Sequence, residues 1–133
     1  MTLEDLIAKD ALKEAVASYC HHIDARRIDD WCATFTADGV WDGGHLGKFS
    51  GQAELREFVQ SLPKILGEGA LRHSVSNFLI TVDGDKAHLI AYLDLMQVGE
   101  GGSVALIDAA TYDIDYVRQG GRWLIKYMRI IHH

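Results

Sequence analysis

The sequence predicts an α+β domain in which N-terminal helices cover one face of a curved antiparallel sheet. Apolar residues recur at helical spacing in roughly the first half of the chain, and from Leu71 onward they alternate with polar residues, as in strands. Short turns rich in glycine and aspartate divide the second half, and helices followed by strands are typical of this fold class. A length of 133 residues suits one domain, which we expect to span residues 1–133.

The first predicted helix opens at a capping box formed by Thr2 and Asp5. Its apolar stripe continues at helical spacing as far as Ile23, and Asp24 stands where the stripe ends. The charged residues 9–10 predict a kink within this helix.

Two shorter helices are expected over residues 28–35 and 52–66, with a short strand beginning at Val40 between them. Pro63 lies near the end of the second of these helices and should kink or terminate it. These helices would complete the layer that covers the sheet.

Four long strands make up the rest of the predicted sheet. Their connections are short turns, so adjacent strands should pair as an antiparallel meander. The strands are expected at residues 71–82, 86–98, 103–118 and 122–131.

Composition and charge disfavour several classes of function. Thirteen lysines and arginines against 19 acidic residues leave a net charge of −6, which opposes binding to nucleic acid because its phosphates are also negative. No apolar run could span a bilayer and the acidic N-terminus lacks the features of a signal peptide, so we expect a cytoplasmic protein without a membrane partner. The only cysteines, Cys20 and Cys32, should pack as small apolar groups rather than form a disulfide.

A candidate acid–base pair consists of Asp24, at the end of the first helix, and His73, in the first long strand. Alternation places Asn77 on the same strand face as His73, and Tyr112 among apolar residues of the third long strand. Few polar groups among many apolar ones suit a small-molecule pocket. A carboxylate that bonds one imidazole nitrogen raises the basicity of the other, so such a pair can move a proton beside a carbonyl.

Several motifs in register resemble SnoaL-like proteins of the nuclear-transport-factor-2-like superfamily. The resemblance covers nearly the whole chain, and it implies a cone-shaped α+β barrel, in which helices and a curved antiparallel sheet surround an internal cavity. It also implies a homo-oligomer, either a dimer or a trimer. The motifs are Tyr19-x4-Asp24, Trp31-x3-Phe35-Thr-Ala-Asp38-Gly, Gly51, Arg72-His73-x3-Asn77, Asp83-Gly84-Asp85-Lys86-Ala87 and Gly121-Arg122-Trp123.

The resemblance also implies site residues. Asp24 and His73 match the aspartate and histidine that recur in the dehydratases of this superfamily, and Tyr19 is similar in placement to the tyrosine of the bile-acid 7α-dehydratases. Arg129 resembles their late pocket arginine. Gln97 stands where scytalone dehydratase carries a second catalytic histidine, which argues against that reaction itself.

These observations lead to the hypothesis of a cofactor-independent lyase or isomerase, dehydratase-like, that acts on a small apolar carbonyl-bearing or polycyclic substrate. His73 would be the general base and acid, Asp24 its orienting partner, and Tyr19 an electrophilic aid. No metal is expected, because the chain lacks a metal-binding motif and a set made of Asp24, His73 and His45 has no typical ligand spacing. The pocket wall would include Asn77, Trp41, Tyr92, Tyr112 and Arg129.

Other interpretations stay open at this level. His73 and Tyr19 could be structural, and Asp24 could be an exposed acid at a helix end. The domain could be a non-catalytic module for ligand binding or assembly, or an epoxide-hydrolase-type enzyme whose acids would be Asp94 and Asp108. The final residues 132–133, both histidines, could be native or the remnant of a tag.

Overall fold

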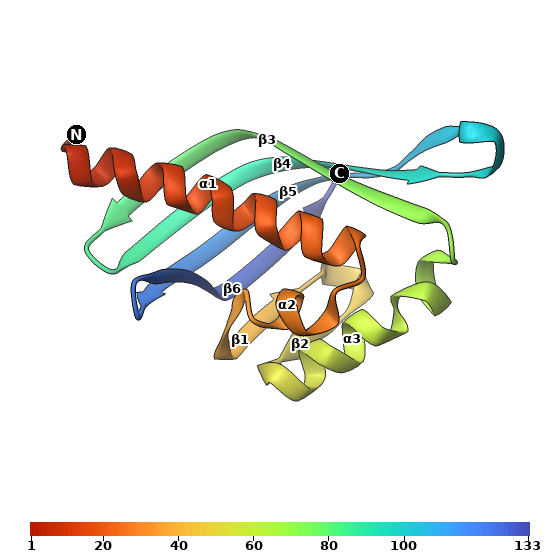
Figure 1. Cartoon of the computed structure of the whole chain (residues 1–133), viewed down its shortest axis with the longest axis horizontal. Helices are drawn as coiled ribbons and strands as arrows, with labels where there is room; N and C mark the ends of the chain where they lie inside the picture. The colour runs from red at the N-terminus through yellow and green to blue at the C-terminus, as the bar shows by residue number, and fades with distance from the viewer.

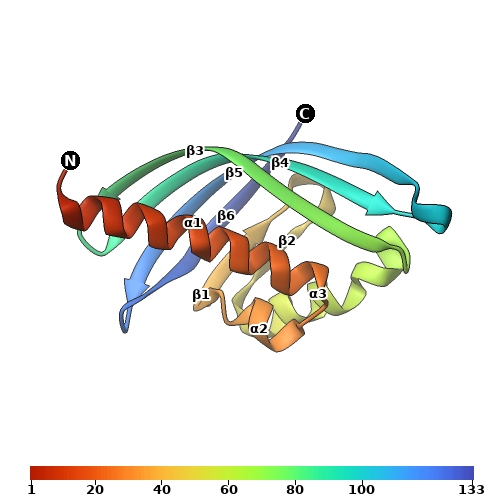
Figure 2. The ribbon, with the colours of Figure 1, turned by 45° about the horizontal axis from the view of Figure 1, so that its top comes forward.

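The computed structural model describes residues 1–133 as a curved, six-stranded sheet with three α-helices on its concave side (Figures 1 and 2). The strand order is β2-β1-β6-β5-β4-β3, and the sheet does not close on itself. The predicted α+β class and the helix-covered curved sheet are therefore confirmed. The helices are α1 (Leu3–Asp24), α2 (Ile28–Cys32) and α3 (Gly51–Leu66), and the strands are β1 (Phe35–Asp42), β2 (Lys48–Ser50), β3 (Ala70–Asp83), β4 (Lys86–Val98), β5 (Val104–Gln119) and β6 (Arg122–His132).

Helix α1 is one unbroken element of 22 residues that lies across the sheet. The predicted capping box is present, because the Thr2 hydroxyl accepts from the Asp5 backbone and the Asp5 carboxylate accepts from the Thr2 backbone. The kink expected at residues 9–10 is absent. Ala8 and Leu12 are both buried, so the apolar stripe continues across the charged pair at a spacing of four residues.

The region between α1 and β3 differs from the prediction in the end of its second helix and in the start of its first strand, which begins at Phe35 instead of Val40. The second helix ends at Cys32 instead of residue 35, because the chain there joins β6: Phe35 lies opposite Ile125, and β1 runs parallel to β6. The third helix ends at Leu66, as predicted, so Pro63 does not terminate it. A proline near a helix end removes one backbone hydrogen bond, and Leu66 still packs against the core.

The four long strands form the predicted meander, since β3, β4, β5 and β6 pair antiparallel in order. Their observed bounds differ from the predicted ones by no more than one residue. The 3-10 turns η1 (Gly44–Leu46) and η2 (Glu100–Gly102) lie between β1 and β2 and between β4 and β5. The sequence analysis missed the parallel pairing of β1 with β6, which joins segments far apart in the chain.

Strand β3 contains a bulge that reverses its alternation. Asn77 adopts a left-handed conformation with φ of 59°, and the pairing with β4 shifts between Ser76 and Leu79. Before the bulge Val75 packs against the core, and after it Phe78 does. A bulge adds one residue to one strand, so the faces exchange and Asn77 is left exposed.

The core fills the space between the sheet and the helices. Tyr19, Trp31 and Tyr112 are among its largest fully buried side chains. Cys20 and Cys32 are buried there as free thiols, as predicted. No helix in this structure combines the length and the apolar character that crossing a membrane requires.

Candidate active site

The Asp24 carboxylate binds His73 through both of its oxygens. Oδ2 accepts a hydrogen bond of 3.0 Å from the His73 backbone N–H, and Oδ1 lies 2.5 Å from Nδ1 of the ring. The His73 side chain is 7% exposed and the Asp24 side chain 21%. The pair forms because α1 packs across β3 and its last residue reaches the start of that strand.

This geometry sets the chemical state of the imidazole. A carboxylate accepts hydrogen bonds, so Nδ1 of His73 carries the proton that points to Asp24. In the neutral ring Nε2 is then the unprotonated nitrogen, and it makes no hydrogen bond within the chain. Nε2 of His73 is therefore suited to act as a base.

His73 forms part of the wall of an internal cavity with a volume of about 50 Å³. Thirteen of the 16 residues that line it are hydrophobic, and among them are Tyr19, Trp41 and Tyr112. Leu46 of η1 and Ile65 of α3 also line the cavity although their side chains are 38% and 50% exposed, so the cavity wall reaches the protein surface at these two residues.

The Tyr19 hydroxyl lies among aromatic rings on this wall. It accepts a hydrogen bond of 3.0 Å from Nε1 of Trp41, and the Tyr112 ring stands edge-on at a centroid distance of 6.0 Å. Burial raises the pKa of Tyr19 and of Tyr112 well above the usual value. Both phenols therefore stay protonated at neutral pH, and Tyr19 keeps an O–H group that can donate.

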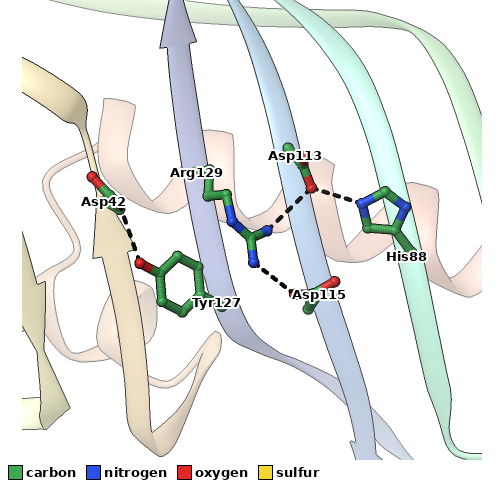
Figure 3. Close-up of polar contacts among 6 residues, drawn as sticks. All are labelled: Asp42, His88, Asp113, Asp115, Tyr127 and Arg129. Carbon is green, nitrogen blue, oxygen red and sulfur yellow. Dashed lines mark hydrogen bonds and ion pairs between the residues drawn. The ribbon is translucent and has the colours of Figure 1, made fainter.

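Three expected wall residues lie elsewhere. Asn77 is exposed at the bulge of β3, and Tyr92 is 54% exposed on the sheet face that points away from the helices. On that same outer face Arg129 binds Asp113 at 3.2 Å and Asp115 at 3.1 Å (Figure 3). The structure thus does not bring Asn77, Tyr92 or Arg129 to the cavity. Strand alternation explains why Tyr92 and Arg129 point outward. The residues before and after each of them are apolar and buried in the core, so the two side chains between them point to the opposite face.

The alternative ligand sets do not assemble either. Asp94 is exposed and no arginine lines the cavity, so the Asp–Arg–Asp set of the epoxide hydrolases is not present there. The His45 ring packs against His132, at a centroid distance of 4.6 Å. No group of three or more histidine, cysteine or acidic side chains is placed to hold a metal ion.

A second acid–imidazole pair lies on the cavity wall, and its pairing was not predicted although Asp108 was named as a candidate acid. Nδ1 of His132 lies 2.8 Å from Oδ2 of Asp108, and Nε2 lies 2.8 Å from the backbone oxygen of Gly43. Alternation already placed Asp108 on the strand face of Tyr112, but it gave no indication of a histidine partner. For His132 the sequence held no signal, because it is the last residue of β6 and its partner Asp108 lies on β5.

Cys20 lies one helical turn before Asp24 and is not a candidate nucleophile. Burial, together with the negative charge of Asp24, raises the pKa of its thiol to about 12. On the outer side of the wall, Asp24 and His73 also border a surface depression with Arg72. The carboxylate of Asp24 is thus open to solvent on the side away from the cavity.

Comparisons with solved structures identify the fold. An aspartate-to-asparagine variant of a protein of unknown function from Mycobacterium tuberculosis is 24% identical, with a TM-score of 0.89 over 98% of this chain and 74% of that one. A candidate scytalone dehydratase from Novosphingobium aromaticivorans is 16% identical, with a TM-score of 0.85 over 100% and 89%. The β subunit of a candidate aromatic-ring-hydroxylating dioxygenase from the same organism is 21% identical, with a TM-score of 0.83 over 96% and 90%.

Two further similar structures are described as having a cystatin-like fold, and one of these two is also described as nuclear-transport-factor-2-like. This chain has the same fold. No curated protein sequence matches the chain. The sequence profile of the SnoaL-like domain matches residues 4–129. The resemblance inferred from the motifs is confirmed, and the chain belongs to the SnoaL-like domain family.

Proposed function

We propose that this protein is a cofactor-independent lyase or isomerase that acts on a small, largely apolar, carbonyl-bearing molecule. One observation carries the proposal: Asp24 fixes the ring of His73 at the wall of an apolar cavity, with Nε2 unbonded and the Tyr19 phenol on the same wall. The similarity to a candidate scytalone dehydratase supports the same class of chemistry.

In the proposed mechanism, Nε2 of His73 removes a proton from the carbon beside the carbonyl group. Tyr19 donates a hydrogen bond to the carbonyl oxygen, where negative charge develops. His73 then returns the proton, to a leaving hydroxyl in an elimination or to another carbon in an isomerisation. Asp24 stabilises the charged imidazolium between the two steps. A positioned acid–base group of this kind accelerates proton transfer on the order of 10² to 10⁴-fold.

The size of the cavity restricts the substrate. Its volume of about 50 Å³ is well below the roughly 300–1,000 Å³ of sites for drug-sized ligands. A molecule with a few heavy atoms is therefore the best candidate. A polycyclic substrate would need a larger cavity, and the partly exposed side chains of Leu46 and Ile65 are the lining residues that can move toward solvent to enlarge it.

The test is proton exchange beside a carbonyl group. Incubation with 4-hydroxy-2-butanone in D₂O, followed by proton NMR, reports both deuterium uptake next to the carbonyl and loss of water to give the enone. We expect the protein to accelerate exchange, and His73→Ala to reduce the rate on the order of 10² to 10⁴-fold.

His88→Ala is the matched control, because His88 pairs with Asp113 at 2.6 Å on the outer face and should leave the rate unchanged. Equal rates for wild type, His73→Ala and Asp24→Asn would refute the mechanism.

A second candidate function is ligand binding without catalysis. The small free volume favours it, because the side chains of the protein fill most of the space between helices and sheet. Binding of the ketone without any acceleration of exchange would favour this function over the first.

A further inference from the structure

We propose that Asp108, oriented by His132, is a second polar anchor of the cavity and binds a hydroxyl group of the substrate. This inference rests on the proposed function only in placing the substrate in this cavity. It narrows the substrate class to small hydroxy-carbonyl compounds whose bound hydroxyl group lies away from His73. That hydroxyl group is therefore retained, and of the two reactions proposed above, isomerisation is the one that His73 would catalyse on such a substrate.

The sheet register places the two anchors in one row. His73 on β3 lies opposite Leu95 on β4, and Leu95 lies opposite Asp108 on β5. Directly opposite residues point to the same face of a sheet, and neighbouring strands are about 4.8 Å apart, so the backbones at His73 and Asp108 are roughly 10 Å apart. Both side chains line the cavity, with apolar Leu95 between them. This span suits a short molecule with a polar group at each end.

The Asp108 carboxylate is held in a fixed orientation with one oxygen to spare. Its Oδ2 bonds Nδ1 of His132, while Oδ1 makes no hydrogen bond within the chain. The other nitrogen of His132 faces the Gly43 backbone oxygen, so the ring is held on both sides. The Asp108 and His132 side chains are only 23% and 18% exposed. Because this side chain keeps some exposure, a ligand that displaces water from Oδ1 must replace the lost hydrogen bond with a donor of its own.

The residues of the cavity wall determine which kind of ligand group can bind Asp108. A carboxylate oxygen accepts and cannot donate, so a bare carbonyl compound gains nothing from Asp108. No third histidine, cysteine or acid is placed beside the pair to complete a cation site. The hydrophobic residues of the wall favour a ligand whose body is apolar. A neutral hydroxyl group attached to a short carbon chain meets these conditions.

The experiment compares two ketones that differ in one hydroxyl group. Dissociation constants of 4-hydroxy-2-butanone and 2-butanone are measured by NMR titration of the full chain. We expect wild-type protein to bind the hydroxy-ketone about tenfold or more tightly, which is the effect of one hydrogen bond to a charged acceptor. In Asp108→Ala the preference should fall to about twofold or less, while the affinity for 2-butanone stays the same.

Asp113→Ala is the matched control. Asp113 lies on the same strand and also pairs with a histidine, His88, but on the outer face. This variant should keep the full preference. His132→Phe tests the positioning role of His132: it should weaken binding of the hydroxy-ketone without changing that of 2-butanone, a difference that a general loss of structure would not produce.

Several outcomes overturn the proposal. They are equal affinities in wild-type protein, a preference that survives Asp108→Ala, and no measurable binding of either ketone. The wild-type comparison requires no variant, so it decides the question even if Asp108→Ala does not fold. Failure of the proposed function can be distinguished from failure of this inference. If only the proposed function is wrong, His73→Ala leaves the rate of proton exchange unchanged, while wild-type protein still binds 4-hydroxy-2-butanone more tightly than 2-butanone.

Discussion

Asp24 contacts His73 at two points, since one carboxylate oxygen accepts from the backbone N–H and the other lies against Nδ1 of the ring. The backbone bond ties the end of α1 to β3, so the ring bond forms at a fixed position instead of depending on two mobile side chains. The same carboxylate is open to solvent on its outer side. A structural link between helix and sheet thus also orients a base at the cavity.

Asp24→Asn should reverse the tautomer of His73. The amide presents either a weaker acceptor or a donor to Nδ1, and a donor there requires the ring proton to move to Nε2, which removes the base. Nitrogen-15 NMR of the ring should show a shift from the Nδ1–H form toward the Nε2–H form. Asp113→Asn, on the outer face, should leave the His73 signals unchanged. An unaltered His73 tautomer in Asp24→Asn would contradict the assigned roles.

Tyr19→Phe should destabilise the fold and reduce catalysis. The Nε1 group of Trp41 loses its acceptor in a buried site, which costs about 1–3 kcal/mol of the free energy of unfolding. Urea denaturation measures this loss. In a double-mutant cycle with Trp41→Phe, the pair should cost at least about 0.5 kcal/mol less than the sum of the single variants. Additive costs would show that the hydrogen bond contributes nothing.

Alkaline pH should weaken the fold through Cys20. The folded-state pKa of this thiol is raised to about 12 from an ordinary value of 9.0, so the unfolded chain releases its proton first as pH rises. The contribution of the Cys20 thiol to the free energy of unfolding is fully present below pH 9.0 and is lost toward pH 12. About 1 kcal/mol of it is lost by pH 10. Urea denaturation at pH 8 and pH 10 should show this loss, and Cys20→Ala should reduce it. The same loss in both proteins would assign it to other groups, among them buried Tyr19 and Tyr112.

The bulge at residue 77 should tolerate glycine and reject β-branched residues. Asn77 has a φ of 59°, a conformation that glycine adopts freely and asparagine tolerates. Asn77→Gly should change the free energy of unfolding by a few tenths of a kcal/mol, whereas Asn77→Val should cost about 1–3 kcal/mol. Thermal or urea unfolding of both variants measures the difference. Equal costs would mean that the left-handed conformation is not required.

Arg129→Ala should leave the cavity unaffected. The guanidinium binds Asp113 and Asp115 on the outer face and is 40% exposed, so its removal should cost no more than about 1 kcal/mol of stability. The affinity of 4-hydroxy-2-butanone and the rate of proton exchange should match those of wild type. A large fall in either quantity would restore the role that the resemblance implied for this arginine.

The sequence by itself determined those features that depend on local patterns. The capping box at Thr2 and the ends of the four long strands follow from residues within a few positions of each other. Local patterns placed Asp24 at the end of an apolar stripe and His73 near the start of a strand, but it was the resemblance to SnoaL-like proteins that favoured a catalytic role for the two. Their bonding in the structure agrees with the geometry on which the catalytic hypothesis depends.

Only the tertiary structure decided which strand face meets the helices and which distant segments join. Alternation divides each strand into two sets of side chains, but a bulge at Asn77 exchanges the sets, and burial of the apolar neighbours turns Tyr92 and Arg129 outward. The parallel pairing of β1 with β6 and the meeting of Asp108 with His132 join residues from separate strands. Such pairs are fixed by the register of the whole sheet, and no short window of sequence contains both partners.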